Sequence, residues 1–517
     1  MHNAALRTLA IYAICVPLAL IFGYLLAGPL DYSTLGFFAL LAFVLAFPIL
    51  LKWHHPLLLF AWNFAGVLFF LPGQPPFWMA LAGVSLVFSI LQRALDKNVR
   101  LLNVPQVTWP LLCLVAVVLV TAKFTGLGLR VFGNDVYGGK KYVQLLGAVV
   151  GYFALSARPI PPDRRKLYVG LFFLAGVSSF IGDLISFAPS SLYPVFYLFP
   201  PNIGFFTTNS LETDATRFTG TVFVSLALVS FMLARYGIRG IFLSGKPWRW
   251  VFLILASLYG LFGGFRGHLV FLALIFILQF FLEGMHRTKL LPVFTFILLA
   301  GAVAIVPLAS RLPYTFQRAI SFLPLNVSQA AKADAQDSLD WRLKMWDGLL
   351  PQVPQYLWLG KGYVISPQDY NFVMGWDASV RGGFAEDQSL ALSDDFHNGP
   401  LSVILPFGIW GVIAFVWFIA AGIWVLYRNY RYGDPALKLI NTFLLAVFVA
   451  RVIFFLFVFG GLQSDMAYFC GWLGLSISLN GGVCKRAKAK AAAAKPETPG
   501  RSFRDFSPTP AFQRQLG

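Results

Sequence analysis

One histidine has the residue type and the position for acid–base chemistry. His397 stands at the end of a polar stretch, residues 311–400, just before apolar residues resume. An imidazole titrates near pH 6.5, so it can take a proton from a hydroxyl group near neutral pH. Asp394 and Asp395 stand close by, and either carboxylate is able to orient the ring. A single histidine at such a boundary can also be structural, and His268 is a second candidate for the base.

Three arginines have the chemistry to bind an anion. Arg217 directly precedes an apolar run, and Arg266 lies in a tight glycine-rich turn between two apolar runs. Arg342 belongs to the polar stretch that His397 ends. A guanidinium group binds phosphate oxygens through two parallel hydrogen bonds. We therefore expect these arginines to bind a phosphate-containing ligand.

A fourth arginine, Arg451, lies inside an apolar run, near one end of it. Charges inside membrane segments are costly and usually indicate function, although a long side chain can also extend to the interface. Asp183, in another apolar run, is a candidate partner for its charge.

The elements that position these residues are membrane helices. The 517 residues are 58% hydrophobic and only 12% charged, far from the composition of a soluble domain. Apolar runs of about 17–22 residues recur, which is the length that a helix needs to cross hydrocarbon. They do not alternate apolar and polar residues as the strands of a membrane barrel do. The sequence therefore predicts an all-α, polytopic helical membrane protein.

We predict about fourteen transmembrane helices, with twelve as the lower limit: residues 8–27, 35–51, 56–72, 77–92, 106–122, 142–157, 167–187, 219–234, 249–264, 266–283, 290–309, 401–427, 437–459 and 465–483. Lys and Arg collect in alternate short connections, and such residues mark the cytoplasmic side. This places both termini in the cytoplasm and His397 on the opposite face. His54, His55 and His286 then fall in cytoplasmic loops.

The chain divides into four parts on this reading. Residues 1–310 hold the first eleven helices, and 311–400 form a large extracytoplasmic loop. Residues 401–484 hold the last three helices, and 485–517 form a basic tail. The tail has too few apolar residues for a core, so we expect it to be disordered and cytoplasmic.

Short helices are expected within the large loop. Leu339, Leu343, Trp346 and Leu350 recur at helical spacing there, which indicates an amphipathic helix on the membrane surface that ends before Gly360.

Other ligands and chemistries have little support. The net charge of +18 lies mostly in short loops and the tail, so we expect no nucleic acid partner. The four cysteines show no metal-ligand or redox spacing. Asp394 and Asp395 lack a second acidic cluster, so we expect no metal and no cofactor. The sequence contains no phosphate-binding P-loop and no hydrolase or zinc-protease motif.

Four local patterns resemble those of a known family. They are Arg217-Phe218-Thr219-Gly220, the turn Gly264-Phe265-Arg266-Gly267, Arg342 to Trp346 followed by Gly360-Lys361-Gly362, and His397-Asn398 followed by Leu401, Gly408 and Gly411. In this order around a large loop, they are similar to the motifs of the bacterial O-antigen ligase and polymerase superfamily. The resemblance covers about residues 215–480. Pro406 departs from it, because many relatives carry Glu there, and the proline is expected to kink its helix.

The resemblance implies a glycosyltransferase of the bacterial inner membrane, with its large loop in the periplasm. The donor would be a glycan on undecaprenyl diphosphate, and the acceptor a hydroxyl of lipid A core or of another glycan. Arg217, Arg266 and Arg342 match the family's essential arginines, and His397 matches its essential histidine. The reaction would be inverting and independent of metal, with Arg266 and His397 as catalytic residues. Arg451, Asp395 and Trp346 are further substrate-binding candidates.

Two alternatives remain open. A polymerase of O-antigen or exopolysaccharide would use the same chemistry with a second lipid-linked glycan as acceptor. A membrane transporter would favour inverted repeats and broken helices near the midplane, which the sequence does not show.

Overall fold

The computed structural model describes most of the chain. It covers residues 32–97, 101–129, 138–201, 203–205, 216–288, 290–365 and 395–485, with five further positions between 16 and 23. Asp394, most of the predicted first span (8–27) and nearly all of the predicted tail (485–517) lie outside these residues.

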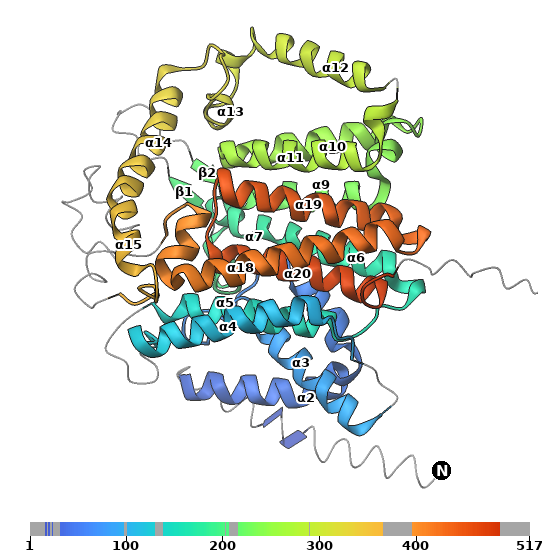
Figure 1. The fold of residues 1–517 in the computed structure, drawn as a ribbon, viewed down its shortest axis with the longest axis vertical. Helices are drawn as coiled ribbons and strands as arrows, with labels where there is room; N and C mark the ends of the chain where they lie inside the picture. The colour runs from blue at the N-terminus through green and yellow to red at the C-terminus, as the bar shows by residue number, and fades with distance from the viewer. Residues whose placement is uncertain are drawn as a thin grey trace, which may run out of the picture.

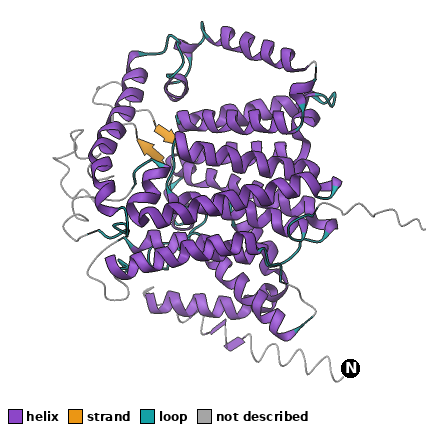
Figure 2. Cartoon of the chain, viewed as in Figure 1, coloured by secondary structure: helices purple, strands orange, loops and turns teal. Residues whose placement is uncertain are grey.

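The described chain is almost entirely helical (Figure 2). The first part contains α2 (Tyr32–Ala61), α3 (Phe77–Leu95), α4 (Pro105–Thr125), α5 (Gly139–Ser156), η2 (Pro162–Arg164), α6 (Arg165–Leu174), η3 (Ala175–Ser179), α7 (Phe180–Asp183), η4 (Leu184–Phe187), η5 (Ser190–Leu192) and α8 (Val195–Leu198). Two short strands follow, β1 (Ile203–Phe205) and β2 (Thr216–Phe218), which pair antiparallel with Gly204 opposite Arg217.

The second part begins with helices that reach the large loop. These are α9 (Thr219–Phe242), α10 (Pro247–Tyr259), η6 (Gly260–Gly263), α11 (Arg266–Leu282), η7 (Met285–Arg287), α12 (Leu290–Ile305) and η8 (Ala309–Arg311). The loop holds α13 (Tyr314–Ile320), α14 (Gln329–Leu349), η9 (Leu350–Gln352) and α15 (Val353–Tyr356). The chain then continues through α18 (Gly399–Tyr432), η11 (Pro435–Leu437), α19 (Lys438–Phe457) and α20 (Leu462–Asn480).

Most long helices run side by side, and α14 crosses one end of them (Figure 1). We call this the His397 end, because His397 directly precedes α18 there. Seven described helical segments are long and apolar enough to cross a membrane: Val44–Ala61, Phe77–Leu95, Pro105–Thr125, Pro162–Asp183, Thr219–Phe242, Gly399–Tyr432 and Pro435–Phe457. The predicted all-α class with several membrane helices is confirmed in this form, and the number fourteen is not.

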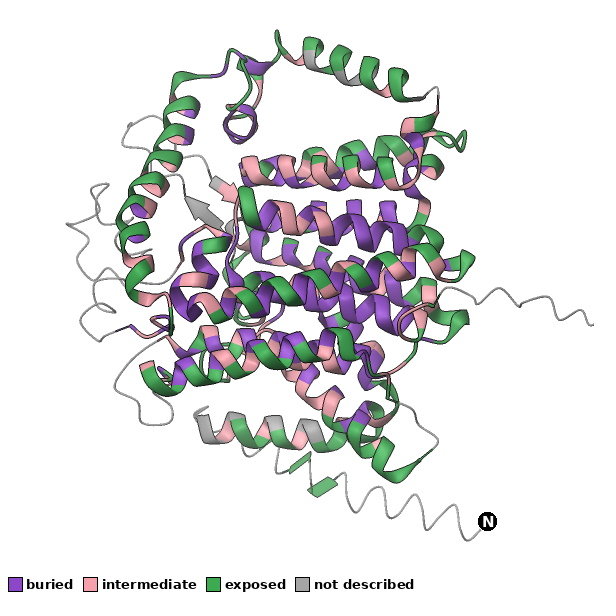
Figure 3. Ribbon diagram, in the orientation of Figure 1, coloured by how far each residue is buried: buried purple, intermediate pink, exposed green. Residues whose placement is uncertain are grey.

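The centre of the bundle is built from α5, α9, α19 and α20, whose residues are largely buried (Figure 3). Neither α5 nor α20 is among the seven segments that are long and apolar enough to cross a membrane, although α20 has almost every side chain buried. A helix enclosed by other helices can keep serines and glycines, because it faces protein rather than lipid. In contrast, the apolar helix α12 has most of its described side chains exposed (Figure 3).

The predicted second and third spans differ from the structure. One helix, α2, covers 35–51 and continues to Ala61, with Pro48 and Pro56 inside it, and residues 63–72 are not helical. The predicted loop between the spans is therefore helix. His54 and His55 are buried within it and bond to Ser85 at 2.9 Å and to the Leu155 carbonyl at 2.9 Å. They are structural residues, and not loop residues as predicted.

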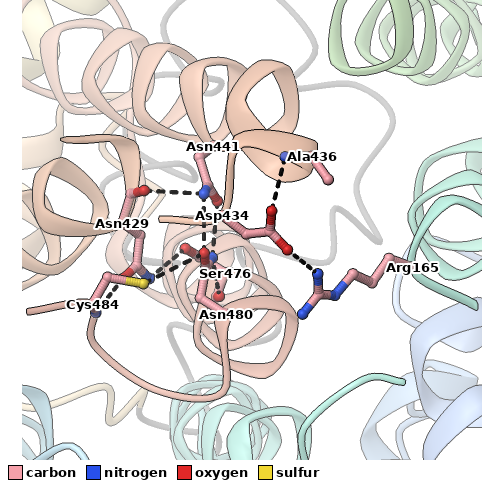
Figure 4. Close-up of polar contacts among 8 residues, drawn as sticks. All are labelled: Arg165, Asn429, Asp434, Ala436, Asn441, Ser476, Asn480 and Cys484. Atoms are coloured by element: carbon pink, nitrogen blue, oxygen red, sulfur yellow. Dashed lines mark hydrogen bonds and ion pairs between the residues drawn. The ribbon is translucent and has the colours of Figure 1, made fainter. Parts of the chain in front are cut away.

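A polar network joins three helices at the end of the bundle opposite His397 (Figure 4). Asn429 of α18 donates to the Ser476 hydroxyl of α20 at 3.1 Å, and its side-chain oxygen accepts from the Cys484 amide at 2.9 Å. Asn441 of α19 exchanges side-chain hydrogen bonds of 3.0 and 2.9 Å with Asn480. The network fixes the three helices in register.

Candidate functional site

Arg217 lies where the two short strands meet the start of α9. Its Nε donates to the Gly263 carbonyl at 3.2 Å, and its guanidinium lies 4.0 Å from the centre of the Phe265 ring. Both partners belong to the turn that precedes Arg266. Arg217 lies on β2, which pairs antiparallel with β1, and it contacts this turn. The sequence spacing of the two motifs did not predict this contact.

Arg266 begins α11 and reaches across to the large loop. Its Nη2 donates to the Ala335 carbonyl of α14 at 2.8 Å. Arg318 of α13 makes the reciprocal contact, since its Nη1 donates to the Gly264 carbonyl at 2.7 Å. Arg318 is also paired with Asp334, the residue before Ala335. The turn, α13 and α14 are therefore tied to one another by arginine side chains.

Arg342 lies further along α14 and faces aromatic rings. Its guanidinium carbon lies 5.2 Å from the Trp341 ring centre and 5.9 Å from that of Phe459. Its buried Nε has no hydrogen-bond partner among the residues that the structure describes. A buried N–H without an acceptor is costly, so this nitrogen favours an oxygen ligand.

The arginine charges act on one another. Burial, followed by repulsion from Arg266 and Arg318, lowers the pKa of Arg342 to about 10, while Asp395 acts in the opposite direction. Burial and the charge of Arg318 likewise lower the pKa of Arg217 to about 10. Both side chains remain protonated at neutral pH. An anion bound among these arginines would relieve their mutual repulsion.

His397 lies at the edge of this cluster, in a left-handed backbone conformation with φ of +51°. Its Nδ1 is 2.9 Å from the Asp395 carbonyl oxygen, and the Asp395 carboxylate lies 3.6 Å away. A carbonyl can only accept, so Nδ1 carries a proton and the neutral ring has its lone pair on Nε2. This is the tautomer that a general base at Nε2 requires.

Aromatic rings hold the imidazole from two sides. Trp341 contacts it edge to face with centroids 5.3 Å apart, and Phe459 does so at 4.9 Å. Trp346 supports the same segment, because its Nε1 donates to the Phe396 carbonyl at 2.8 Å. The following residue, Asn398, caps α18 by accepting from the Leu401 amide at 3.0 Å. The structure therefore places Arg342, Trp346, Asp395 and His397 in one neighbourhood.

The rival histidine is enclosed. His268 is 5% exposed, and its Nε2 lies 3.0 Å from the Ser225 hydroxyl between α11 and α9. The His397 side chain, in contrast, is 17% exposed. Of the two histidines, His397 is the more accessible to an acceptor hydroxyl.

Arg451 pairs with Asp465 at the start of α20, and not with Asp183. The Asp465 carboxylate also accepts from the Gly461 amide at 2.9 Å. Asp183 instead accepts from the Gly220 amide at 3.0 Å. Since a protein carboxylate already meets the Arg451 charge, its geometry favours a structural role over substrate binding.

Sequence reasoning missed three residues of this region. Arg318 was one of many loop cations, Asp334 had no recognisable motif, and Asp465 is the one charged residue of α20. The charge of Asp465 in an apolar segment was the available signal. Within the part of the chain that the structure describes, no three His, Cys, Asp or Glu side chains are grouped to hold a metal ion.

Residues 251–416 match a family model described as O-antigen ligase. The matched segment runs from α10 into α18, and it contains Arg266, Arg318, Arg342 and His397. No curated protein matches the chain significantly. The resemblance that the sequence motifs indicated is confirmed over this segment.

Proposed function

We propose that this chain, whose residues 251–416 match the O-antigen ligase family model, transfers a glycan from a polyprenyl-diphosphate donor to an acceptor hydroxyl. The donor is undecaprenyl-diphosphate-linked, and the acceptor is lipid A core or another glycan. The protein lies in the bacterial inner membrane with both termini in the cytoplasm and the His397 end in the periplasm. The proposal is supported chiefly by one contact, in which Phe459 faces both the Arg342 guanidinium and the His397 imidazole.

The arginines bind the diphosphate. Arg217, Arg266 and Arg342 present positive charge where a leaving diphosphate gains negative charge as the bond to the sugar breaks. Fixed donors at such a position stabilise the transition state more than the ground state. The Nε of Arg342 has no hydrogen-bond partner among the described residues, so it is a candidate donor to a phosphate oxygen.

His397 activates the acceptor. Its Nε2 takes the proton of the acceptor hydroxyl while the oxygen attacks the anomeric carbon from the side opposite the diphosphate. The bond from that carbon to the diphosphate breaks, and its electron pair leaves with undecaprenyl diphosphate. The anomeric configuration inverts. A diphosphate is a good leaving group, so the step needs neither a general acid nor a metal.

The test is a surface-glycan gel from cells that lack the protein. The cells are complemented with the wild-type protein, Arg266→Ala, His397→Ala or Arg235→Ala, the last being an exposed arginine of α9. With Arg266→Ala or His397→Ala, we expect long polymer to remain on the lipid carrier and the acceptor to stay bare. With Arg235→Ala, we expect the normal pattern. Single repeat units on the acceptor would instead mean a polymerase. Normal glycan from well-folded Arg266→Ala and His397→Ala proteins would refute the site.

A further inference from the structure

α18 is interrupted within the segment that follows His397. Pro406 lies inside the helix, and Gly408 has φ of 60° and ψ of −161°. This backbone region is essentially restricted to glycine. In a regular helix the amide of Ile409 would bond to Leu405, four residues earlier. Here it donates to the carbonyl of Leu357, at 2.7 Å.

A segment of the large loop replaces the hydrogen bonds that the interruption removes. The amide of Lys361 donates to the Leu405 carbonyl at 2.9 Å, and that of Gly362 donates to the Pro406 carbonyl at 3.0 Å. Together with the bond from Ile409 to Leu357, these contacts fit residues 357–362 into the break in α18. We call residues 357–362 the bridging segment.

The fit leaves no room for side chains at two glycines. A Cβ on Gly360, which has φ of +80°, would lie 2.1 Å from the Pro406 carbonyl oxygen. A Cβ on Gly408 would lie 2.5 Å from the Leu357 carbonyl oxygen. Both clashes are with backbone atoms, so neither can be relieved by turning a side chain.

The other side of the bridging segment is fixed to the bundle. The Thr121 hydroxyl of α4 donates to the Leu359 carbonyl at 2.9 Å. Immediately after the segment, the Tyr363 amide donates to the Tyr142 hydroxyl of α5 at 3.0 Å. The segment is thus held by α4 and α5 while it binds the broken part of α18.

The break separates a short first part of α18, Gly399–Phe407, from the rest of the helix. Asn398 caps this first part, and His397 comes just before Asn398. The bridging segment comes soon after α14, which carries Arg342 and Trp346. Two connections therefore fix the base relative to the arginines. One is the hydrogen bond from Trp346 to Phe396, and the other is the bridging segment.

We propose that the bridging segment sets the orientation of the first part of α18, Gly399–Phe407, and thereby of His397 just before it. Gly360 and Gly408 are the positioning residues. This inference rests on the proposed transfer reaction. It assigns no contact with substrate to either glycine. Their effect reaches the reaction through the place of the imidazole relative to the arginine-bound diphosphate, and such displacement slows a reaction strongly.

The test compares Gly360→Ala and Gly408→Ala with Gly348→Ala. Gly348 lies in α14 of the same loop, and a Cβ there meets nothing within 4 Å. With reconstituted protein and a lipid-linked glycan donor, we expect kcat to fall at least tenfold in the first two variants. The donor KM should stay within about threefold, because the arginines are unchanged. Gly348→Ala should match the wild type.

Hydrogen exchange supplies a readout that does not depend on activity. The amides of Lys361, Gly362 and Ile409 should exchange slowly in the wild type and faster in the two variants, with exchange in α20 unchanged. If these amides exchange fast in a variant that keeps the wild-type kcat, the proposal is overturned. Slow exchange of the same amides in Gly360→Ala would also overturn it. If the wild type transfers no glycan, the proposed function fails instead, and the exchange still reports whether the segment is bound.

Discussion

Trp341 meets the imidazole of His397 edge to face, with ring centroids 5.3 Å apart and an interplanar angle of 87°. The next residue on α14, Arg342, lies over the same indole, and Phe459 contacts both the guanidinium and the imidazole. The proposed base, His397, and one proposed phosphate-binding residue, Arg342, therefore share two aromatic neighbours. Displacing either ring would move both functional groups at once.

Replacing Arg342 tests the anion site. We expect Arg342→Ala to lower kcat by about 10²–10³-fold, the usual cost of removing one donor to a developing negative charge. Arg342→Lys keeps the charge but not the planar fork, so its activity should lie between that of the wild type and that of Arg342→Ala. The measurement is glycan transfer by purified protein in proteoliposomes. Equal rates for Arg342→Ala and the control Arg235→Ala would contradict this role.

The pH dependence of transfer tests the histidine. Only the neutral imidazole can accept a proton, so the rate should fall when acid protonates the ring. Arg217 and Arg342 have pKa values lowered to about 10, and they keep their charge at neutral and acidic pH. Their charge is lost as pH rises through about 10, which predicts a second fall there.

His397→Gln provides the control for this profile. The residual activity of this variant should lack the acid limb but keep the alkaline fall, because the arginines remain. An acid limb that persists unchanged would assign it to another group.

The pair of Arg451 and Asp465 tests whether a buried charge pair is structural. Asp465 is fully buried, so removing its partner leaves an uncompensated charge. We expect Arg451→Leu alone to destabilise the protein by about 3–5 kcal/mol. The double variant with Asp465→Leu should recover most of this loss. Thermal unfolding in detergent measures both. A double variant that folds stably yet binds donor poorly would show instead that Arg451 contacts substrate.

The asparagine network of Figure 4 should matter for stability alone. Asn429→Ala leaves the Cys484 amide without its acceptor and the Ser476 hydroxyl without its donor, at a cost of about 1–3 kcal/mol. Asn103→Ala, at an exposed position, should cost little. Unfolding temperatures compare the two. We expect folded Asn429→Ala protein to retain wild-type kcat, and a selective loss of kcat would contradict a purely structural network.

The helices were largely readable from apolar length, and the exceptions have physical causes. The predicted spans 219–234 and 437–459 correspond to α9 and α19, because each run is bounded by polar or turn residues. In the sequence, the polar residues Lys52, His54 and His55 indicated a loop. In the structure, they lie within helix α2. The structure buries both histidines against helices that are distant in sequence, so their hydrogen bonds compensate for burial. Sequence alone does not show such partners.

The amphipathic helix of the large loop was also only partly predictable. Its spacing correctly indicated a helix through Trp346. Leu349 is buried, however, whereas Leu339 and Leu343 are 45% and 49% exposed. The residues that α14 buries, including Ala331 and Ala335, are small and carry little hydrophobic signal.

For the candidate site, sequence supplied the residue types, and the structure supplied their partners. Arg266 and His397 were chosen from motif and position. The bonds from Arg266 to Ala335 and from Arg318 to Gly264 join residues more than fifty positions apart. No local spacing encodes such contacts.

The packing of α5 against α20 has a consequence for how the protein is made. Ile160, just after α5, donates to the Ser478 carbonyl of α20, and Gly474 lies against Leu155. α20 leaves the ribosome long after α5, so the side of α5 that packs on α20, including Tyr152 and Leu155, has no α20 partner until then. Chains that stop before Leu462 would expose this face permanently. The packed centre of the bundle is therefore complete only when α20 has been synthesised and has joined α5.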